Sequence, residues 1–118
     1  LVTNSKNVDV LFHESMSLEL LDLINKQAKK TNNYLMDKIT IDILDYHTPI
    51  LDVVKAANEA NVSHLVFYHH LPAPRNQLME NVMYRGVDEI RDGWTASHDG
   101  TMVILPVDST EIIVSAVE

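Results

Sequence analysis

The sequence contains no cysteine, and its 118 residues include only nine lysines and arginines. Without cysteine the chain can form neither a disulfide nor a zinc site built on thiolates, so its chemistry must use other side chains. The absence of cysteine suits both reducing and oxidising compartments, and the choice between cytoplasm and periplasm is left open. Aspartate and glutamate number 17, which gives a formal net charge of −8. Nucleic-acid binders usually carry a basic surface, so this balance argues against RNA or DNA as a partner.

Long apolar runs are also missing. No run approaches the roughly 20 residues that a membrane-spanning helix requires, so we expect no membrane span. Residues 1–14 lack the charged and apolar regions of a signal peptide. The chain begins at leucine, which we interpret as the start of a fragment, with any targeting segment upstream. Its length suits a single domain, residues 1–118, with one hydrophobic core.

Alternating apolar patterns organise the rest of the sequence. Residues 8–14 and 63–69 are rich in β-branched and other apolar residues and predict two buried strands. Residues 34–47 fit a helix, although "ITIDIL" within them alternates like a strand; we favour the helix because no turn residues isolate the alternating part. Two helix N-caps are predicted, at Ser17 and, before a proline in the first helical turn, at Thr48. The helices expected between the two strands are residues 17–30, 34–47 and 48–62.

The strand–helix–strand order is typical of α/β layering, in which the two strands lie parallel. Further along, residues 76–87 predict a short helix that ends near Gly86. The last part of the chain predicts a turn at residues 98–100 and short strands around residue 94, at 102–105 and at 112–114. We therefore expect an α/β fold, with a mixed sheet and helices mainly on one face.

Histidines and a glutamate occur where the expected strands end. His13 and Glu14 close the first strand, His69 and His70 close the second, and His47 precedes the helix that leads into the second. Ligands of α/β sheets bind beyond the carboxyl ends of the strands, and a helix N-terminus adds backbone N–H groups suited to an anion. We therefore expect these groups to converge at one rim, where imidazole and carboxylate can bind zinc. The alternative is unrelated surface histidines, because the sequence has neither HExxH nor HxHxD spacing.

Three blocks carry a more specific pattern: "VDVLFHE", "DYHTPILDVVKAANEANVSHLVFYHHLPAP" and "DGTMVILP". Together they resemble the C-terminal half of a metallo-β-lactamase-fold hydrolase, in the branch of ribonuclease Z and the arylsulfatase-like enzymes. In that family a strand ending in His-Glu precedes an HT or HS helix start, a strand ending in a metal-ligating histidine and a closing hairpin. The resemblance implies that the fold is half of an αββα sandwich.

The resemblance also implies roles for individual residues. It makes His69 a metal ligand, and it makes His47 a catalytic residue that acts on the substrate in proton transfer. Glu14 is the second catalytic residue, which orients His47. The resemblance gives no part in the site to the other histidines, which are His13, His64, His70 and His98.

The sequence departs from the family in its metal ligands. The family's HxHxDH motif, a further histidine and a bridging aspartate lie upstream of the matching region, and these blocks are absent here. Because a catalytic zinc needs about three protein ligands, we expect this chain alone to bind zinc weakly or not at all and to be inactive.

The resemblance therefore implies an intact protein that holds two zinc ions and hydrolyses phosphodiesters, sulfate esters or other small esters. Its missing N-terminal half, or a homodimer partner, would complete it. The alternative is a non-catalytic α/β module that associates through its exposed sheet or edge.

Overall fold

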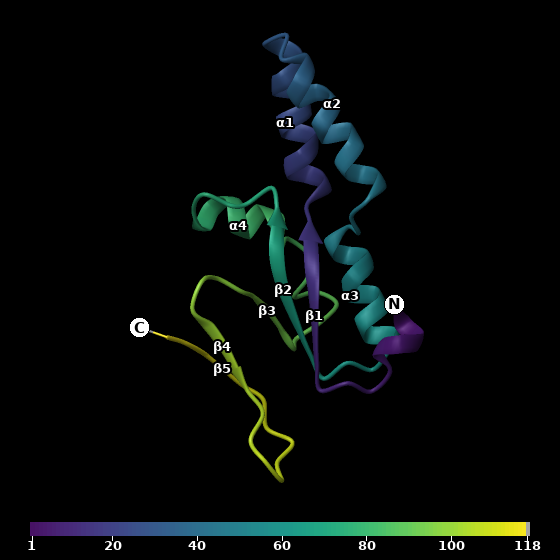
Figure 1. Cartoon of the computed structure of the whole chain (residues 1–118), viewed down its shortest axis with the longest axis vertical. Coiled ribbons are helices and arrows are strands. Elements are labelled where there is room, and N and C mark those ends of the chain that lie inside the picture. Colours follow the sequence, from purple (N-terminus) through teal and green to yellow (C-terminus); the bar gives the residue numbers. More distant parts are fainter. Residues whose placement is uncertain (118) are drawn as a thin grey trace.

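The structure of the chain, a computed structural model, describes residues 1–117 (Figure 1). The α-helices of these residues are α1 (Leu18–Lys30), α2 (Tyr34–Asp42), α3 (Ile50–Glu59) and α4 (Gln77–Met83). The strands are β1 (Val10–Met16), β2 (His64–Leu71), β3 (Trp94–Ala96), β4 (Thr101–Ile104) and β5 (Ile113–Ala116). Two short 3-10 helices are η1 (Val2–Ser5) and η2 (Ile43–Asp45). The expected α/β class is confirmed, as is the choice of helix over strand for the segment that forms α2 and η2.

Two sheets are present among residues 1–117, where we expected one mixed sheet. β1, β2 and β3 form a parallel sheet in that order, while β4 and β5 pair antiparallel with each other. The expected parallel pair is confirmed, but the single mixed sheet is wrong. The expected turn at residues 98–100 is present, with Gly100 at a φ of 87° and the Thr101 N–H donating to the His98 carbonyl at 2.9 Å. This turn connects β3 of the parallel sheet to β4 of the hairpin, so the two strands on either side of it do not pair with each other.

A side-chain cap determines where α1 begins, whereas a contact with β1 determines where α3 begins. The side chain of Ser17 accepts from the Leu20 N–H at 3.2 Å, which confirms the cap of α1. The cap expected at Thr48 is wrong, because α3 begins at Ile50 with Pro49 as its N-cap residue. Pro49 has an extended ψ of 141° and forms a parallel bridge with Met16. The pairing with the end of β1 therefore holds Pro49 out of the first helical turn.

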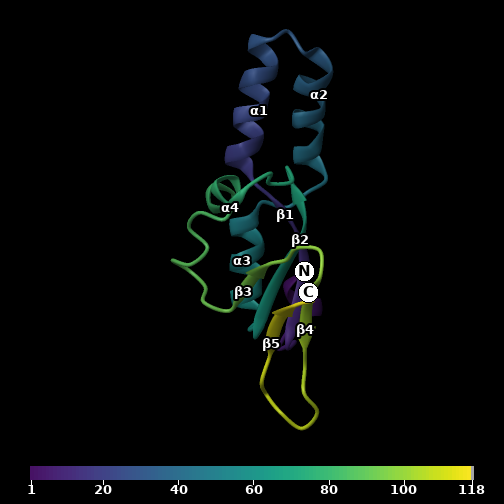
Figure 2. The same cartoon turned by 90° about the vertical axis from the view of Figure 1, so that its left-hand side faces the viewer.

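The core lies between α3 and one face of the parallel sheet. Val53, Val54 and Ala57 of α3 are fully buried together with Leu65 and Phe67 of β2. The C-terminal end of α4 joins the same cluster, so α3 and α4 cover one face, whereas α1 and α2, which were expected there too, cover neither face. In Figure 2, α3 lies beside β1 and β2, whereas the β4–β5 hairpin lies toward the opposite side.

Helices α1 and α2 form an arm that projects beyond the sheet (Figures 1 and 2). The side-chain amide of Asn25 joins the two helices, donating to Asp37 Oδ1 at 2.6 Å and to Thr40 Oγ1 at 2.8 Å. The arm makes the molecule elongated, with a radius of gyration of 16.0 Å. A compact domain of this length would have about 13.5 Å. Among residues 1–117, no helix is long and apolar enough to cross a membrane.

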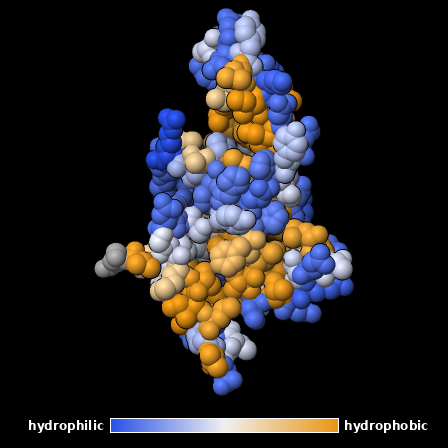
Figure 3. Space-filling view, in the orientation of Figure 1, coloured by the Kyte–Doolittle hydropathy of each residue, from blue (hydrophilic) through white to orange (hydrophobic). Residues whose placement is uncertain are grey.

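The face of the parallel sheet opposite α3 is covered only in part: Val66, which alternates with the core residues Leu65 and Phe67, lies on it and is fully buried. On it the side chains of Phe12 and Tyr68 are 56% and 50% exposed. The β4–β5 hairpin adds further exposed apolar side chains, which include Met102, Ile104, Ile113 and Val114. We call this surface the open face. Figure 3 shows apolar surface in this region and again on the arm, with polar surface between the two.

Candidate functional site

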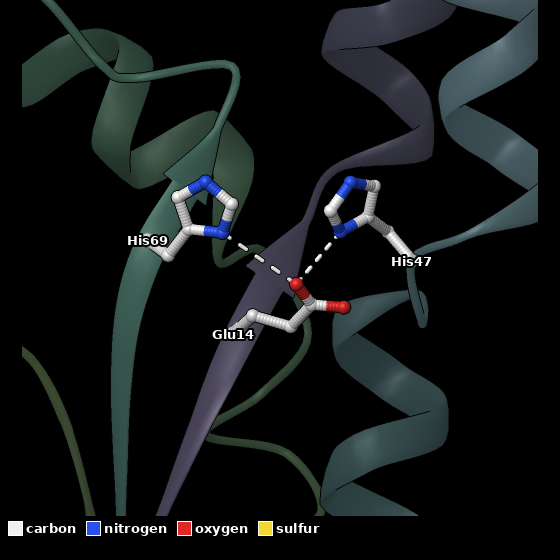
Figure 4. Close-up of side chains that lie close together, drawn as sticks. All are labelled: Glu14, His47 and His69. Atoms are coloured by element: carbon white, nitrogen blue, oxygen red, sulfur yellow. Dashed lines mark hydrogen bonds and ion pairs between the residues drawn. The ribbon is translucent and has the colours of Figure 1, made fainter.

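Glu14, His47 and His69 meet at the carboxyl end of β1 and β2 (Figure 4). Nδ1 of His47 lies 2.7 Å from Glu14 Oε2, and Nδ1 of His69 lies 3.5 Å from the same oxygen. The two imidazole centroids are 5.7 Å apart. The expectation that these three side chains share one rim of the sheet is confirmed, while their roles stay predictions.

Strand alternation places Glu14. Successive side chains of a strand point to opposite faces, and Leu11 packs against the α3 core. Phe12 and Glu14 therefore share the open face. Glu14 lies opposite Tyr68 of the neighbouring strand, near the end of the parallel pair. Its carboxylate is thus presented beside the end of β2 and not toward the helix layer.

A bulge in β2 places His69. Glu14 is paired with Tyr68 and the next residue, Ser15, with His70, so His69 is an extra residue between the two pairs. His69 has a φ of 47°, in the left-handed region. That region is uncommon for residues other than glycine, although histidine is among those enriched in it, and bulges often re-aim a side chain next to a functional site. The bulge directs the His69 imidazole toward Glu14 (Figure 4).

The segment between η2 and α3 places His47. Pro49, two residues further on, is tied to Met16 at the end of β1 by the parallel bridge. This bridge brings His47 beside the end of the strand that carries Glu14. An ionised carboxylate can only accept hydrogen bonds, so Nδ1 of His47 donates to Glu14. Nε2 of His47 is then the nitrogen that can take up or release a proton.

The charge of Glu14 is set by its two histidine neighbours. Partial burial raises the pKa of Glu14, but the hydrogen bond and charge of His47, with the hydrogen bond of His69, lower it below its usual value of 4.5. Glu14 is therefore a carboxylate at neutral pH. A carboxylate in this position accepts the Nδ1 hydrogen of His47 and holds the orientation of its ring.

The lowered pKa predicts how stability depends on pH. Glu14 has its ordinary pKa of 4.5 in the unfolded chain and a lower value in the folded chain. Its ionised form therefore stabilises the fold above pH 4.5, and this contribution is lost as the pH falls through the folded-state pKa. We expect the difference in unfolding free energy between wild type and Glu14→Gln to shrink as the pH is lowered from 4.5 through the folded-state pKa. Urea unfolding of both proteins on either side of pH 4.5 measures it, and a constant difference would contradict the expectation.

The three side chains offer a donor set that fits zinc. Two imidazole nitrogens and one carboxylate oxygen lie within 4.8 Å of one another, and zinc in proteins takes such N and O ligands. Glu14 Oε2 is the nearest acceptor to His47 Nδ1, so a metal and His47 compete for this oxygen. His69 stands further from the carboxylate, and its side chain is 55% exposed. Of the three, His69 is therefore the residue most available to a metal ion.

A hollow of about 700 Å³ adjoins the site beyond the end of β2. Its lining includes Tyr68, His69, Pro74 and His98. His98 was expected in a turn and without a role in the site, and it does lie in the turn before β4. Its Nε2 is 3.1 Å from Glu80 Oε2. The hollow gives a small molecule access to His69 from the solvent.

The remaining histidines contact their own surroundings. His13 Nδ1 lies 2.8 Å from the Glu14 carbonyl, and His64 Nε2 lies 2.8 Å from Thr95 Oγ1. His70, which is partly buried, makes a set of hydrogen bonds that the sequence pattern did not indicate. The partners of His70 are distant in the sequence, so the pattern around His70 could not reveal these hydrogen bonds.

Comparison with known proteins adds no further residue to the site. No protein-family model matches the chain, and no curated protein matches it. The case for Glu14, His47 and His69 therefore rests on their geometry and chemistry.

Proposed function

We propose that this chain is the C-terminal part of a metal-dependent hydrolase of the metallo-β-lactamase fold. The intact enzyme holds two zinc ions and cleaves phosphodiesters, sulfate esters or other small esters. The observation that carries the proposal is the cluster of Glu14, His47 and His69 at the carboxyl end of a parallel strand pair. Ligand sites of α/β sheets lie at such ends.

The open face supports the proposal that the fold is half of a sandwich. Phe12 and Tyr68 expose large apolar surfaces on the same side of the sheet as Glu14. Exposed apolar patches of this kind mark surfaces that another body covers. A second half packed there would bury these side chains and bring the missing metal ligands next to His69.

The three residues divide the chemistry in the intact enzyme. Bound zinc would supply an activated water and polarise the scissile ester. His69 holds the metal. His47 donates the proton on Nε2 to the oxygen of the leaving group, and its ring then keeps the Nδ1 proton bonded to Glu14. Glu14 stays ionised throughout, orients the ring and stabilises its charged form.

The isolated chain is expected to bind zinc weakly and to hydrolyse no ester. It supplies at most the three donors of the cluster, where complete structural zinc sites have four ligands and apparent binding energies of roughly 10–16 kcal/mol. Calorimetric titration with zinc chloride, with His69→Ala as the reference, measures the affinity. Tight stoichiometric binding would contradict the expectation. So would turnover of an aryl phosphodiester that His69→Ala abolishes.

A second candidate function is a non-catalytic module that associates through the open face or a sheet edge. The exposure of Phe12 and Tyr68 favours it, and β1 and β3 form the two edges of the parallel sheet. Unpaired strand edges and apolar patches both promote association. The coding sequence upstream of Leu1 separates the two functions, because an HxHxDH motif there supports only the hydrolase.

Both candidate functions predict that the isolated chain associates with itself. A double variant tests whether the open face is the surface through which it does so. Replacing Phe12 and Tyr68 together by serine removes the two largest apolar side chains of the sheet on that face. We expect the double variant to sediment as a monomer at concentrations where the wild type associates. A matched double variant on the arm, Leu23→Ser with Leu35→Ser, should leave that association unchanged. The reverse result would move the interface to the arm.

A further inference from the structure

The side chain of His70 is held at both ring nitrogens. Its Nδ1 lies 2.6 Å from the Tyr84 hydroxyl and 3.0 Å from Ser15 Oγ, and its Nε2 lies 2.7 Å from the Ser97 carbonyl oxygen. Ser15 and Tyr84 are themselves buried, and their hydroxyl oxygens are 2.9 Å apart. These contacts join β1, β2, the end of α4 and the segment after β3. We call Ser15, His70, Tyr84 and Ser97 the His70 clamp.

The contacts of the clamp fix a hydrogen on one nitrogen of the His70 ring. A carbonyl oxygen only accepts hydrogen bonds, so Nε2 of His70 carries the hydrogen and donates to Ser97. Nδ1 faces the hydroxyls of Ser15 and Tyr84, and the Tyr84 O–H donates to Ser15 Oγ. Burial raises the pKa of the Tyr84 phenol, which therefore stays protonated as a donor. Ser97 is anchored in turn, because its N–H and Oγ both donate to the Phe67 carbonyl.

The clamp lies directly beside the bulge that presents His69. The left-handed φ of 47° at His69 is unfavourable for a residue with a Cβ, so its surroundings must hold it. Without the bulge, β2 would pair one residue out of step beyond Tyr68, and a shift of one residue moves a side chain to the opposite face. His70 is the first residue after the bulge, and its ring is tied to Ser15, the residue with which it pairs.

We infer that His70 is a positioning residue, whose clamp holds the bulged backbone that directs His69 toward Glu14 and a bound metal ion. This inference rests on the proposed role of His69 as a metal ligand. His70 itself does not touch the metal, because both of its ring nitrogens are engaged within the clamp. Its role resembles that of the outer hydrogen-bond partners that orient metal ligands, whose loss typically lowers metal affinity by about 10- to 100-fold.

The test is a calorimetric zinc titration of the 118-residue chain, with NMR of the His69 ring resonances in the variants that keep His69. His70→Phe keeps an aromatic ring and removes both hydrogen-bonding nitrogens, and we expect it to weaken zinc binding by about 10- to 100-fold. His64→Phe is the matched control. His64 lies at the other end of β2 and bonds to Thr95 at 2.8 Å, so its loss should leave the zinc affinity unchanged. His70→Gln, which retains a donor for the Ser97 carbonyl, should recover part of the affinity.

The outcomes separate the inference from the proposed function. If His69→Ala leaves zinc binding intact, the metal-ligand role is wrong and the inference falls with it. If His69→Ala abolishes binding but His70→Phe and His64→Phe behave alike, the metal-ligand role stands and the positioning role is wrong. If His70→Phe does not fold, Tyr84→Phe decides, because it removes a single hydroxyl of the clamp. Unchanged zinc affinity in that folded variant and in His70→Gln would overturn the inference.

Discussion

In the complete hydrolase of which we propose this chain is a part, His47→Ala is expected to lower kcat by about 10²–10⁴-fold while the zinc content stays at the wild-type level. The reason is geometric. The imidazole of His47 is bonded to Glu14 at 2.7 Å, and in the proposed mechanism its other nitrogen acts on the substrate. Its loss would then remove a proton donor and no metal ligand. His69→Ala is expected to lose zinc and activity together. Glu14→Gln should reproduce part of the His47→Ala defect, because it weakens the bond that orients the ring.

Metal analysis beside steady-state kinetics on the three variants measures these effects. His64→Ala serves as the control, since His64 bonds to Thr95 at the far end of β2, and it should change neither zinc content nor rate. If His47→Ala strips zinc as thoroughly as His69→Ala does, then His47 is a ligand and the division of roles is wrong. If neither variant changes rate or zinc content, the proposed site is wrong.

Phe67→Ala is expected to cost about 3–5 kcal/mol of unfolding free energy. Phe67 is fully buried between the sheet and α3, and its ring lies 5.3 Å from that of Tyr84 and 6.3 Å from that of Trp94, measured between centroids. Truncation to alanine removes these contacts and leaves a cavity that the surrounding side chains fill only in part. Urea unfolding followed by the fluorescence of Trp94, the single tryptophan, measures the loss.

The other phenylalanine provides the matched control. Phe12 lies on the open face and is 56% exposed, so Phe12→Ala should change the unfolding free energy by no more than about 0.5 kcal/mol. Phe67→Leu, which keeps most of the apolar volume, should cost less than Phe67→Ala. Equal losses from the two alanine variants would contradict the assignment of the core to the α3 side of the sheet.

Much of the candidate site could be located before the tertiary structure was known. Apolar, β-branched runs predicted strands that end at Glu14 and His69, whereas β1 continues to Met16 and β2 to Leu71, so both residues lie two positions before the strand ends. The parallel relation of the two strands follows from the helices between them, and parallel strands end at the same edge. That reasoning brought Glu14, His47 and His69 to one rim, where the structure places them.

Other expectations failed where a remote partner decides the local structure. Thr48 has the chemistry of an N-cap, but the bridge between Pro49 and Met16 moves the start of α3 to Ile50. The strands of the tail were expected in one mixed sheet with the first two, but β4 and β5 pair with each other in a separate hairpin. A local sequence pattern indicates that a residue can cap a helix or form a strand. It does not indicate which distant segment that residue will pair with.

The sequence by itself determined the order of strands and helices and the rim at which the site lies, because apolar periodicities of about 2 and 3.6 residues are local properties of the chain. Only the tertiary structure decided that His69 is a bulged residue pointing to Glu14 and that the partly buried His70 is held at both ring nitrogens. A bulge is defined by the pairing of two strands, and the contact between Ser15 and His70 joins residues 55 positions apart. Such contacts depend on how β1, β2 and the segment after β3 pack together, which no local pattern records.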